Sequence, residues 1–155
     1  LAGAIECMST LSRSASEAMT EVGVNACVDV TGFGLVGHLL ELLRASDVSA
    51  RFSLGSVPLL DGVWELLEQD IAPGGTRRNL AAADRWVAWD EAVDEKTKLL
   101  LCDAQTSGGL LIAVPPEKRD RLLNELKARG VETTAVIGEV LPAGSLGERR
   151  LQVTT

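Results

Sequence analysis

Asp29 is the residue of this chain with the strongest case for chemistry. It follows a run of apolar and β-branched residues and precedes Thr31, Gly32 and Gly34, after which an apolar helical pattern begins. A carboxylate at the end of a strand, before a glycine turn that opens a helix, lies beside free N–H groups and a positive helix dipole, which suits phosphates and their metal ions. The alternative is a local cap, in which the carboxylate accepts N–H groups of the following turn. A single carboxylate does not make a catalytic magnesium site, so further ligands would have to come from another domain or chain.

The glycines after Asp29 also match a dinucleotide-binding spacing. Gly32, Gly34 and Gly37 read as G-x-G-x-x-G between a predicted strand and helix. Such a site needs an acidic residue about 20 positions later to hold the ribose. Residues 53–56 are Ser-Leu-Gly-Ser, and Asp29 puts a charge where a pyrophosphate-binding strand is apolar. The glycines therefore indicate a sharp turn rather than a dinucleotide site.

Two further glycine-containing segments carry polar side chains. Residues 73–79 read Pro-Gly-Gly-Thr-Arg-Arg-Asn, whose N–H groups, hydroxyl, guanidinium groups and amide could hold an oxyanion. The alternative is an exposed turn that caps a short helix at Thr76. Residues 103–109, Asp-Ala-Gln-Thr-Ser-Gly-Gly, could contact a ligand, but a tight turn from a helix into a buried strand is favoured.

The remaining reactive residue types are expected to be structural. His38, the only histidine, lies beside an apolar Leu-Leu pair and is predicted to be partly buried and hydrogen-bonded rather than a proton carrier. Cys27 and Cys102 lie in apolar runs and are predicted to be inert core thiols. The sequence contains no Ser/His/Asp or Cys/His nucleophile arrangement and no P-loop, so no complete active site is recognised in it.

Hydrophobic periodicity predicts an α+β fold with one mixed sheet and helices packed on it. The predicted helices are 4–20, 35–45, a short one around 63–67, 91–101, and one from Pro115 to Gly130, with a further helical turn at 79–84. The predicted strands are 24–30, 49–54, 110–114, 133–140 and a last edge strand at 150–153.

Composition narrows the class of protein. The 155 residues are enough for one domain, and a net charge of −7 argues against nucleic acid or an anionic membrane as a general partner. No run approaches the roughly 18 apolar residues that span a bilayer, and residues 1–20 carry no secretory signal pattern. Three unpaired cysteines fit a reducing compartment, so a cytoplasmic protein is predicted. The chain begins at Leu1 within a helical pattern, and we expect residues 1–155 to be a single domain of a longer protein.

Three motifs in register together resemble one enzyme family. Residues 29–38 (Asp-Val-Thr-Gly-Phe-Gly-Leu-Val-Gly-His), 73–79 and 101–111 (Leu-Cys-Asp-Ala-Gln-Thr-Ser-Gly-Gly-Leu-Leu) are similar to the C-terminal domain of selenophosphate synthetases (selenide, water dikinases). The resemblance runs from the first helix to about Val140. It implies a fold like the C-terminal domain of aminoimidazole ribonucleotide synthetase, which belongs to the same superfamily. Ala104 departs from the proline usual in this family, a change that loosens a turn without removing a functional group.

The resemblance also implies an activity for the parent enzyme. In this family ATP, selenide and water give selenophosphate, AMP and phosphate with Mg²⁺, and the catalytic Cys or selenocysteine and an essential Lys lie in an N-terminal domain absent from this sequence. The fragment alone is therefore expected to be inactive, with its own N-terminal domain as partner and a homodimeric parent. Asp29 carries over as a metal ligand, and our hypothesis is that Gly74, Gly75, Thr76 and Asn79 bind a phosphate or selenium anion.

Two alternatives to this reading stay open. One is the corresponding domain of another superfamily member, an aminoimidazole ribonucleotide synthetase or a thiamine phosphate kinase. The Gly37-His38 pair and the Pro-Gly-Gly-Thr segment argue against both. The other is a non-catalytic binding or regulatory module.

Overall fold

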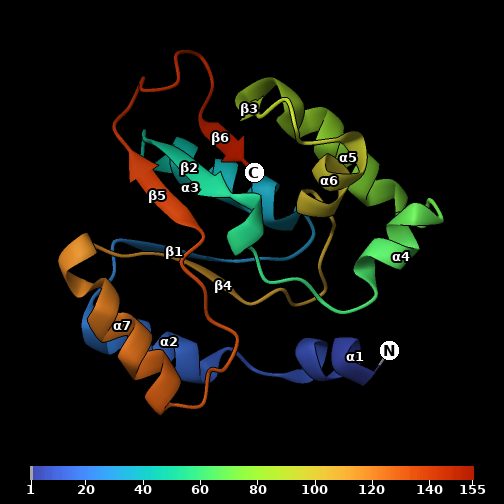
Figure 1. Cartoon of the computed structure of the whole chain (residues 1–155). Coiled ribbons are helices and arrows are strands. Elements are labelled where there is room, and N and C mark those ends of the chain that lie inside the picture. The colour runs from blue at the N-terminus through green and yellow to red at the C-terminus, as the bar shows by residue number, and fades with distance from the viewer. Residues whose placement is uncertain (1) are drawn as a thin grey trace.

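Two β-sheets organise this computed structural model, which describes residues 2–155 (Figure 1). A four-stranded sheet has the order β3-β6-β2-β5, from β2 (Ser49–Ser53), β3 (Val87–Trp89), β5 (Gly138–Leu141) and β6 (Leu151–Thr154). In it, β6 is parallel to β2 and to β3, and β5 is antiparallel to β2. A separate antiparallel pair joins β1 (Ala26–Asp29) to β4 (Leu110–Ala113). The α+β class and the mixed sheet are confirmed, but the prediction of a single sheet was wrong.

Seven helices accompany the sheets in residues 2–155. They are α1 (Ala2–Ser9), α2 (Arg13–Val22), α3 (Gly34–Ala45), α4 (Val63–Glu68), α5 (Gly74–Ala83), α6 (Glu95–Leu101) and α7 (Pro116–Ala128), with 3₁₀ turns at Leu54–Ser56 and Asp84–Trp86. None of the helices in this part of the chain has the length and apolar character to cross a membrane.

The fold has two hydrophobic cores, and the β1–β4 pair contacts both. The four-stranded sheet packs against α3, whose inward face is the predicted apolar stripe; the main buried members are Val36, Leu39, Leu40, Leu43, Phe52, Val87, Leu151 and Val153. The second core joins α2 to α7 through Ala18, Val22, Leu122 and Leu126, with Ile112 of β4 and the neighbouring Val114 packed against it. In Figure 1, α2 and α7 lie side by side at the end of the β1–β4 pair. The β1–β4 pair lies between the two cores, because Leu111 of β4 packs against the first core and Ile112 packs against the second.

Several predicted boundaries differ for local reasons. The helix predicted over 4–20 is two helices, because the chain bends after Ser9, where the Thr10 hydroxyl donates to the Glu6 carbonyl at 2.8 Å. The helix predicted over 91–101 begins only at Glu95, since the Asp94 side chain accepts the Thr97 N–H at 2.8 Å and caps it. The helical turn predicted at 79–84 belongs to the longer α5, and β3 was not among the predicted strands.

The C-terminal strands differ most from the prediction. Of the strand predicted over 133–140, only the end is a strand, β5, which lies so close to β2 that a side chain at Gly138 would overlap the Arg51 carbonyl. The strand predicted at 150–153 is β6, but it is not an edge strand. Leu151 and Val153 are both 0% exposed between the neighbouring strands, so β6 is central to the sheet.

Candidate functional site

Asp29 lies where the sequence predicted it, at the end of a strand before a glycine turn. It is the last residue of β1, is paired with Leu110 of β4, and is exposed to solvent. The hydrogen bonds that close the following turn run between backbone groups: Gly34 N–H donates to the Thr31 carbonyl at 3.0 Å, and so does Gln105 N–H at 2.9 Å. The turn is thus capped by main chain rather than by the carboxylate. Asp29 is left facing solvent at the start of α3.

The 103–109 segment lies directly against the Asp29 turn. Gly108 N–H donates to the Val30 carbonyl at 2.8 Å, and Val30 N–H donates to the Gly109 carbonyl at 2.9 Å. Gly108 approaches so closely that a side chain there would stand 2.9 Å from the Val30 carbonyl oxygen. The segment therefore has the structural role that the sequence favoured, holding the turn after Asp29 from one side.

The predicted anion-binding segment joins the same cluster through Thr76. This side chain is 1% exposed within α5, so the alternative of an exposed cap at Thr76 was wrong; Pro73 stands at the N-cap. The Thr76 hydroxyl donates to Asp103 Oδ1 at 2.6 Å and accepts the Ala104 N–H at 3.3 Å. The amide of Gln105 donates to Asp103 Oδ2 at 3.1 Å. Asp103 is thus held by two side chains from different motifs.

Asn79 connects the 73–79 segment both to the Asp29 turn and to the segment that begins at residue 101. Its amide nitrogen donates to the Gly32 carbonyl at 2.9 Å and to the Cys102 carbonyl at 3.1 Å. The three motifs, dispersed over residues 29–109, therefore meet in one polar cluster. Sequence spacing indicated the motifs but could not indicate that Asp103 would be the partner of Thr76.

The first turn of α5 carries the remaining predicted anion ligands, Gly74 and Gly75. Gly74 is exposed and Gly75 is half-buried, and the first N–H groups of a helix have no partner inside it. The Arg78 guanidinium folds back over this turn, since side chains at Gly74 and Gly75 would stand 3.4 Å and 3.9 Å from its terminal nitrogens. Free N–H groups, a helix N-terminus and a guanidinium suit an oxyanion.

His38 and Cys102 are buried as predicted, but Cys27 is only half-buried, so the prediction that it is a core thiol was wrong. His38 is 7% exposed, with Nε2 lying 3.1 Å from the Thr31 hydroxyl and Nδ1 lying 3.0 Å from the Glu41 carboxylate. Burial raises the pKa of the Cys102 thiol to about 12. Burial, and then the charge of Asp29, raises the pKa of the Cys27 thiol. Both pKa shifts disfavour the thiolate, as expected of unreactive thiols.

The carboxylates near this cluster are sparse. Within residues 2–155 there is no group of three or more His, Cys, Asp or Glu side chains that could hold a metal ion. Asp29 on its own fits one coordination position of a magnesium ion, which takes a few carboxylates together with phosphate oxygens and waters. Among residues 2–155, Asp29 therefore fits as one ligand of a magnesium site that another domain or chain would complete.

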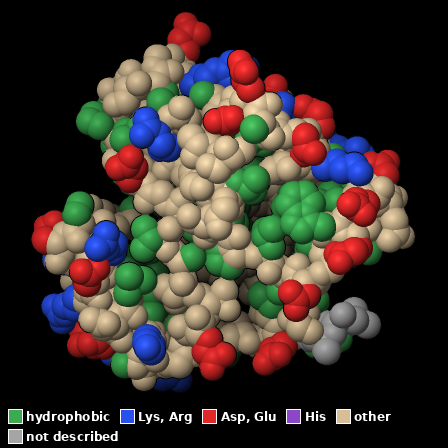
Figure 2. Space-filling view, in the orientation of Figure 1, with side chains coloured by type: hydrophobic (Ala, Val, Ile, Leu, Met, Phe, Trp, Pro, Cys, Tyr) green, Lys and Arg blue, Asp and Glu red, His purple; other side chains and the backbone are tan. Residues whose placement is uncertain are grey.

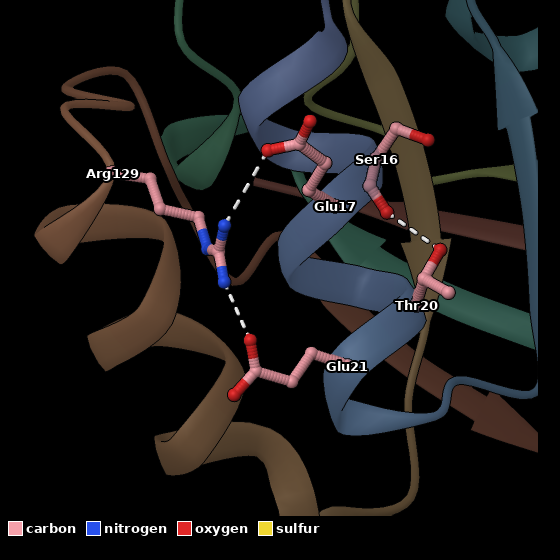
Figure 3. Close-up of a pocket in the computed structure, with 5 residues that line it drawn as sticks. All are labelled: Ser16, Glu17, Thr20, Glu21 and Arg129. Atoms are coloured by element: carbon pink, nitrogen blue, oxygen red, sulfur yellow. Dashed lines mark hydrogen bonds and ion pairs between the residues drawn. The ribbon is translucent and has the colours of Figure 1, made fainter.

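A separate hollow of about 400 Å³ lies between α2 and α7, away from the three motifs. It is lined by Ser16, Glu17, Thr20, Glu21 and Arg129, and Figure 3 shows Arg129 reaching from the end of α7 to the two glutamates of α2. The Arg129 guanidinium thus forms ion pairs with carboxylates of this chain, and these ion pairs join α2 to α7. The hollow has the character of a structural ion-pair network rather than of a binding site.

An apolar patch lies beside the cluster on the segment that carries α4. Its members, between 39% and 54% exposed, are Leu59, Leu60, Trp64, Leu66 and Ile71. Figure 2 shows apolar side chains gathered over this part of the surface. Contiguous apolar surface of this kind is typical of protein contact sites.

Comparison with curated proteins finds relatives that share one name. The chain is 42% identical over 127 residues to "Selenide, water dikinase" of Carboxydothermus hydrogenoformans, a match that covers 82% of the chain and 37% of the relative. It is 44% identical over 139 residues to the protein of that name from Myxococcus xanthus, with 88% and 39% covered. The match to the Photobacterium profundum protein is 46% over 121 residues, with 77% and 34% covered.

The matches cover most of the chain but only part of each relative. The chain spans well under half the length of these relatives, between 34% and 39%. The family described as "AIR synthase related protein, C-terminal domain" matches residues 6–149, which is nearly the whole chain and includes all three motifs. The α+β architecture and the cluster formed by the motifs are thus features of a domain of that kind, and the chain belongs to the family of AIR synthase related protein C-terminal domains.

Proposed function

We propose that this chain is the C-terminal domain of a selenide, water dikinase, and that it contributes a metal ligand and part of the ligand-binding surface to the parent enzyme. The observation that carries the proposal is the exposed Asp29 carboxylate at the point where three sequence motifs meet. The names of the relatives support the selenium chemistry. The parent enzyme uses ATP to phosphorylate selenide, and this domain alone does not turn over.

The chemistry of phosphoryl transfer explains what a single carboxylate can do here. Such reactions depend on positioning and on neutralising charge, and Mg²⁺ supplies that neutralisation when it is bound between phosphate oxygens and carboxylates. Asp29 presents one carboxylate from a strand end that β4 holds in register. The N–H groups of Gly74 and Gly75 favour a phosphate or selenium anion. Thr76 and Asn79 serve that site by holding α5, since Thr76 bonds to Asp103 and Asn79 bonds to Gly32 of the Asp29 turn.

The incomplete site supports a proposal about the partners of the domain. The remaining ligands and the catalytic residues come from the enzyme's own N-terminal domain, in a homodimeric parent that works in the cytoplasm. The apolar patch on the α4 segment supports a contact with another part of the parent, because such surface is rarely left uncovered.

The test is the Asp29→Ala variant of the full-length enzyme. We expect a large loss of Mg²⁺-dependent ATP consumption, most evident at low Mg²⁺, because the variant lacks one ligand. Asp120→Ala is the matched control, since Asp120 is an exposed aspartate of α7, on the other core. Wild-type kinetics of the Asp29 variant at low Mg²⁺ would reject the ligand role. Tight calorimetric binding of Mg-ATP to the isolated chain would show that the site lies elsewhere.

A further inference from the structure

His38 lies behind the Asp29 turn and is bonded to it from inside α3. Its ring nitrogen Nε2 accepts the Phe33 N–H at 3.4 Å and lies 3.1 Å from the Thr31 hydroxyl. The other nitrogen, Nδ1, lies 3.0 Å from Glu41 on the next turn of the helix. One imidazole therefore spans the two residues on either side of Gly32 and the helix that follows.

The contacts determine which nitrogen of His38 carries the proton. A backbone N–H can only donate, so Nε2 must offer its lone pair to Phe33, and the proton of the neutral ring resides on Nδ1. Nδ1–H then donates to the Glu41 carboxylate, which fixes the orientation of the ring. The ring is 7% exposed, so little water is available to replace these bonds.

The backbone around Asp29 is held from two directions. Pairing with Leu110 fixes Asp29 on the side of β1. On the side of α3, the turn has no strand partner and is held by Nε2 of His38, by the Asn79 amide and by backbone bonds. His38 is the side chain of this set that lies on α3, so it couples the turn to the second turn of the helix, beyond the Gly34 N–H at the first residue.

We propose that His38 is a positioning residue, which holds the Thr31–Phe33 turn through Nε2 and thereby keeps the Asp29 carboxylate where it can reach a cation. This inference rests on the proposed function of Asp29. His38 itself touches neither metal nor substrate. Its role is comparable to that of groups that orient metal ligands, whose loss typically lowers metal affinity about 10–100-fold.

Two substitutions of His38 separate the turn contact from the helix contact. The amide oxygen of glutamine reaches the place of Nε2, so His38→Gln keeps an acceptor for the turn. The amide of asparagine reaches only the place of Nδ1, so His38→Asn keeps the contact with Glu41 and loses the hydrogen bond to the turn. A role confined to packing would make the two variants alike.

The experiment measures the Mg²⁺ concentration for half-maximal activity in the full-length enzyme. We expect His38→Asn to raise it about tenfold and His38→Gln to stay within about twofold of the wild type. Leu122→Ala, in the core between α2 and α7, is the control for loss of stability and should leave the Mg²⁺ dependence unchanged. Equal values for the two His38 variants, or a shift of the same size in the control, would overturn the proposal.

A second readout distinguishes failure of this inference from failure of the proposed function. If Asp29→Ala leaves the Mg²⁺ dependence unchanged, the ligand role fails whatever His38 does. Amide hydrogen exchange at Phe33 then still tests the turn: faster exchange in His38→Asn than in His38→Gln supports His38 as the group that holds it. Equal exchange at Phe33 in the two variants refutes that role.

Discussion

Replacing Gly34 with alanine tests how tightly the Asp29 turn is packed against the 102–103 segment. Gly34 has φ of +70°, and a Cβ there would stand 2.6 Å from the Cys102 carbonyl carbon and 2.7 Å from the Asp103 oxygen. The positive φ alone costs alanine about 1–2 kcal/mol. The close atoms belong to backbone, so the overlap can be relieved only if the segment moves.

Movement of that segment has its own cost, which can be assigned to named bonds. It would lengthen the bond from Asn79 to the Cys102 carbonyl and the bond from Thr76 to Asp103, now 3.1 Å and 2.6 Å. Losing a buried hydrogen bond of this kind costs about 1–3 kcal/mol. With about 1–2 kcal/mol for the positive φ and about 1–3 kcal/mol for each of the two bonds, we expect Gly34→Ala to lower the free energy of unfolding by about 3–8 kcal/mol.

Gly62 provides the matched control. It has φ of +84°, but nothing lies within 4 Å of a Cβ placed there, so Gly62→Ala should cost only the conformational part, about 1–2 kcal/mol. Urea unfolding followed by tryptophan fluorescence gives both values. A loss in Gly34→Ala no larger than that in Gly62→Ala would refute the account of the packed turn.

Three further predictions concern single side chains. Iodoacetamide at about pH 8 should label the exposed Cys7 of the native chain and spare Cys102, because burial raises the pKa of the Cys102 thiol to about 12; equal labelling, seen by peptide mass spectrometry, would contradict this. Thr76→Val should lower the free energy of unfolding by about 1.5–3 kcal/mol, because the variant loses the hydroxyl that donates to the Asp103 carboxylate. Thr20→Val, on the exposed face of α2, should change the free energy of unfolding by under about 0.5 kcal/mol. Hydrogen bonds from the hydroxyl and N–H of Thr97 lower the pKa of Asp94. The stabilisation of the fold by the Asp94 carboxylate is therefore complete above the ordinary aspartate pKa and is lost as pH falls through the lowered pKa. The Tm of Asp94→Ala should therefore lie below that of the wild type at neutral pH and meet it near pH 2, and a difference in Tm that persists there would show that the cap is not the cause.

The parts of the fold that the sequence predicted well are those with a long local pattern. Leu39, Leu40 and Leu43 repeat at helical spacing, and α3 has nearly the predicted bounds. By contrast, β3 is only three residues long, follows Trp86 and ends at Trp89, so no alternation was available to reveal it. The central place of β6 depends on pairing with strands far away in the chain, which no window of local sequence contains.

The candidate site divides in the same way. The position of Asp29 at a strand end and the burial of His38 followed from neighbouring residues, and both are confirmed. The hydrogen bond between Thr76 and Asp103 joins residues 27 positions apart, and nothing in the amino-acid sequence of either motif requires this bond. Glycine-rich motifs look alike whether they bind an anion or admit a neighbouring backbone, so the role of Gly74 and Gly75 in binding an anion stays a prediction.

The central position of β6 has a consequence for synthesis of the chain. β3 meets β2 only through β6, so the four-stranded sheet cannot close until residue 154 has left the ribosome. Until then, β2, which carries Phe52, and β3, which carries Val87, have no strand between them. The apolar side chains of both strands lack the β6 neighbours that they have in the folded chain. Pairings this distant in sequence form slowly, and uncovered strands are prone to aggregate. The nascent domain should therefore be most vulnerable until β6 has been translated, and deletion of residues 151–154 should cost it the middle of a sheet.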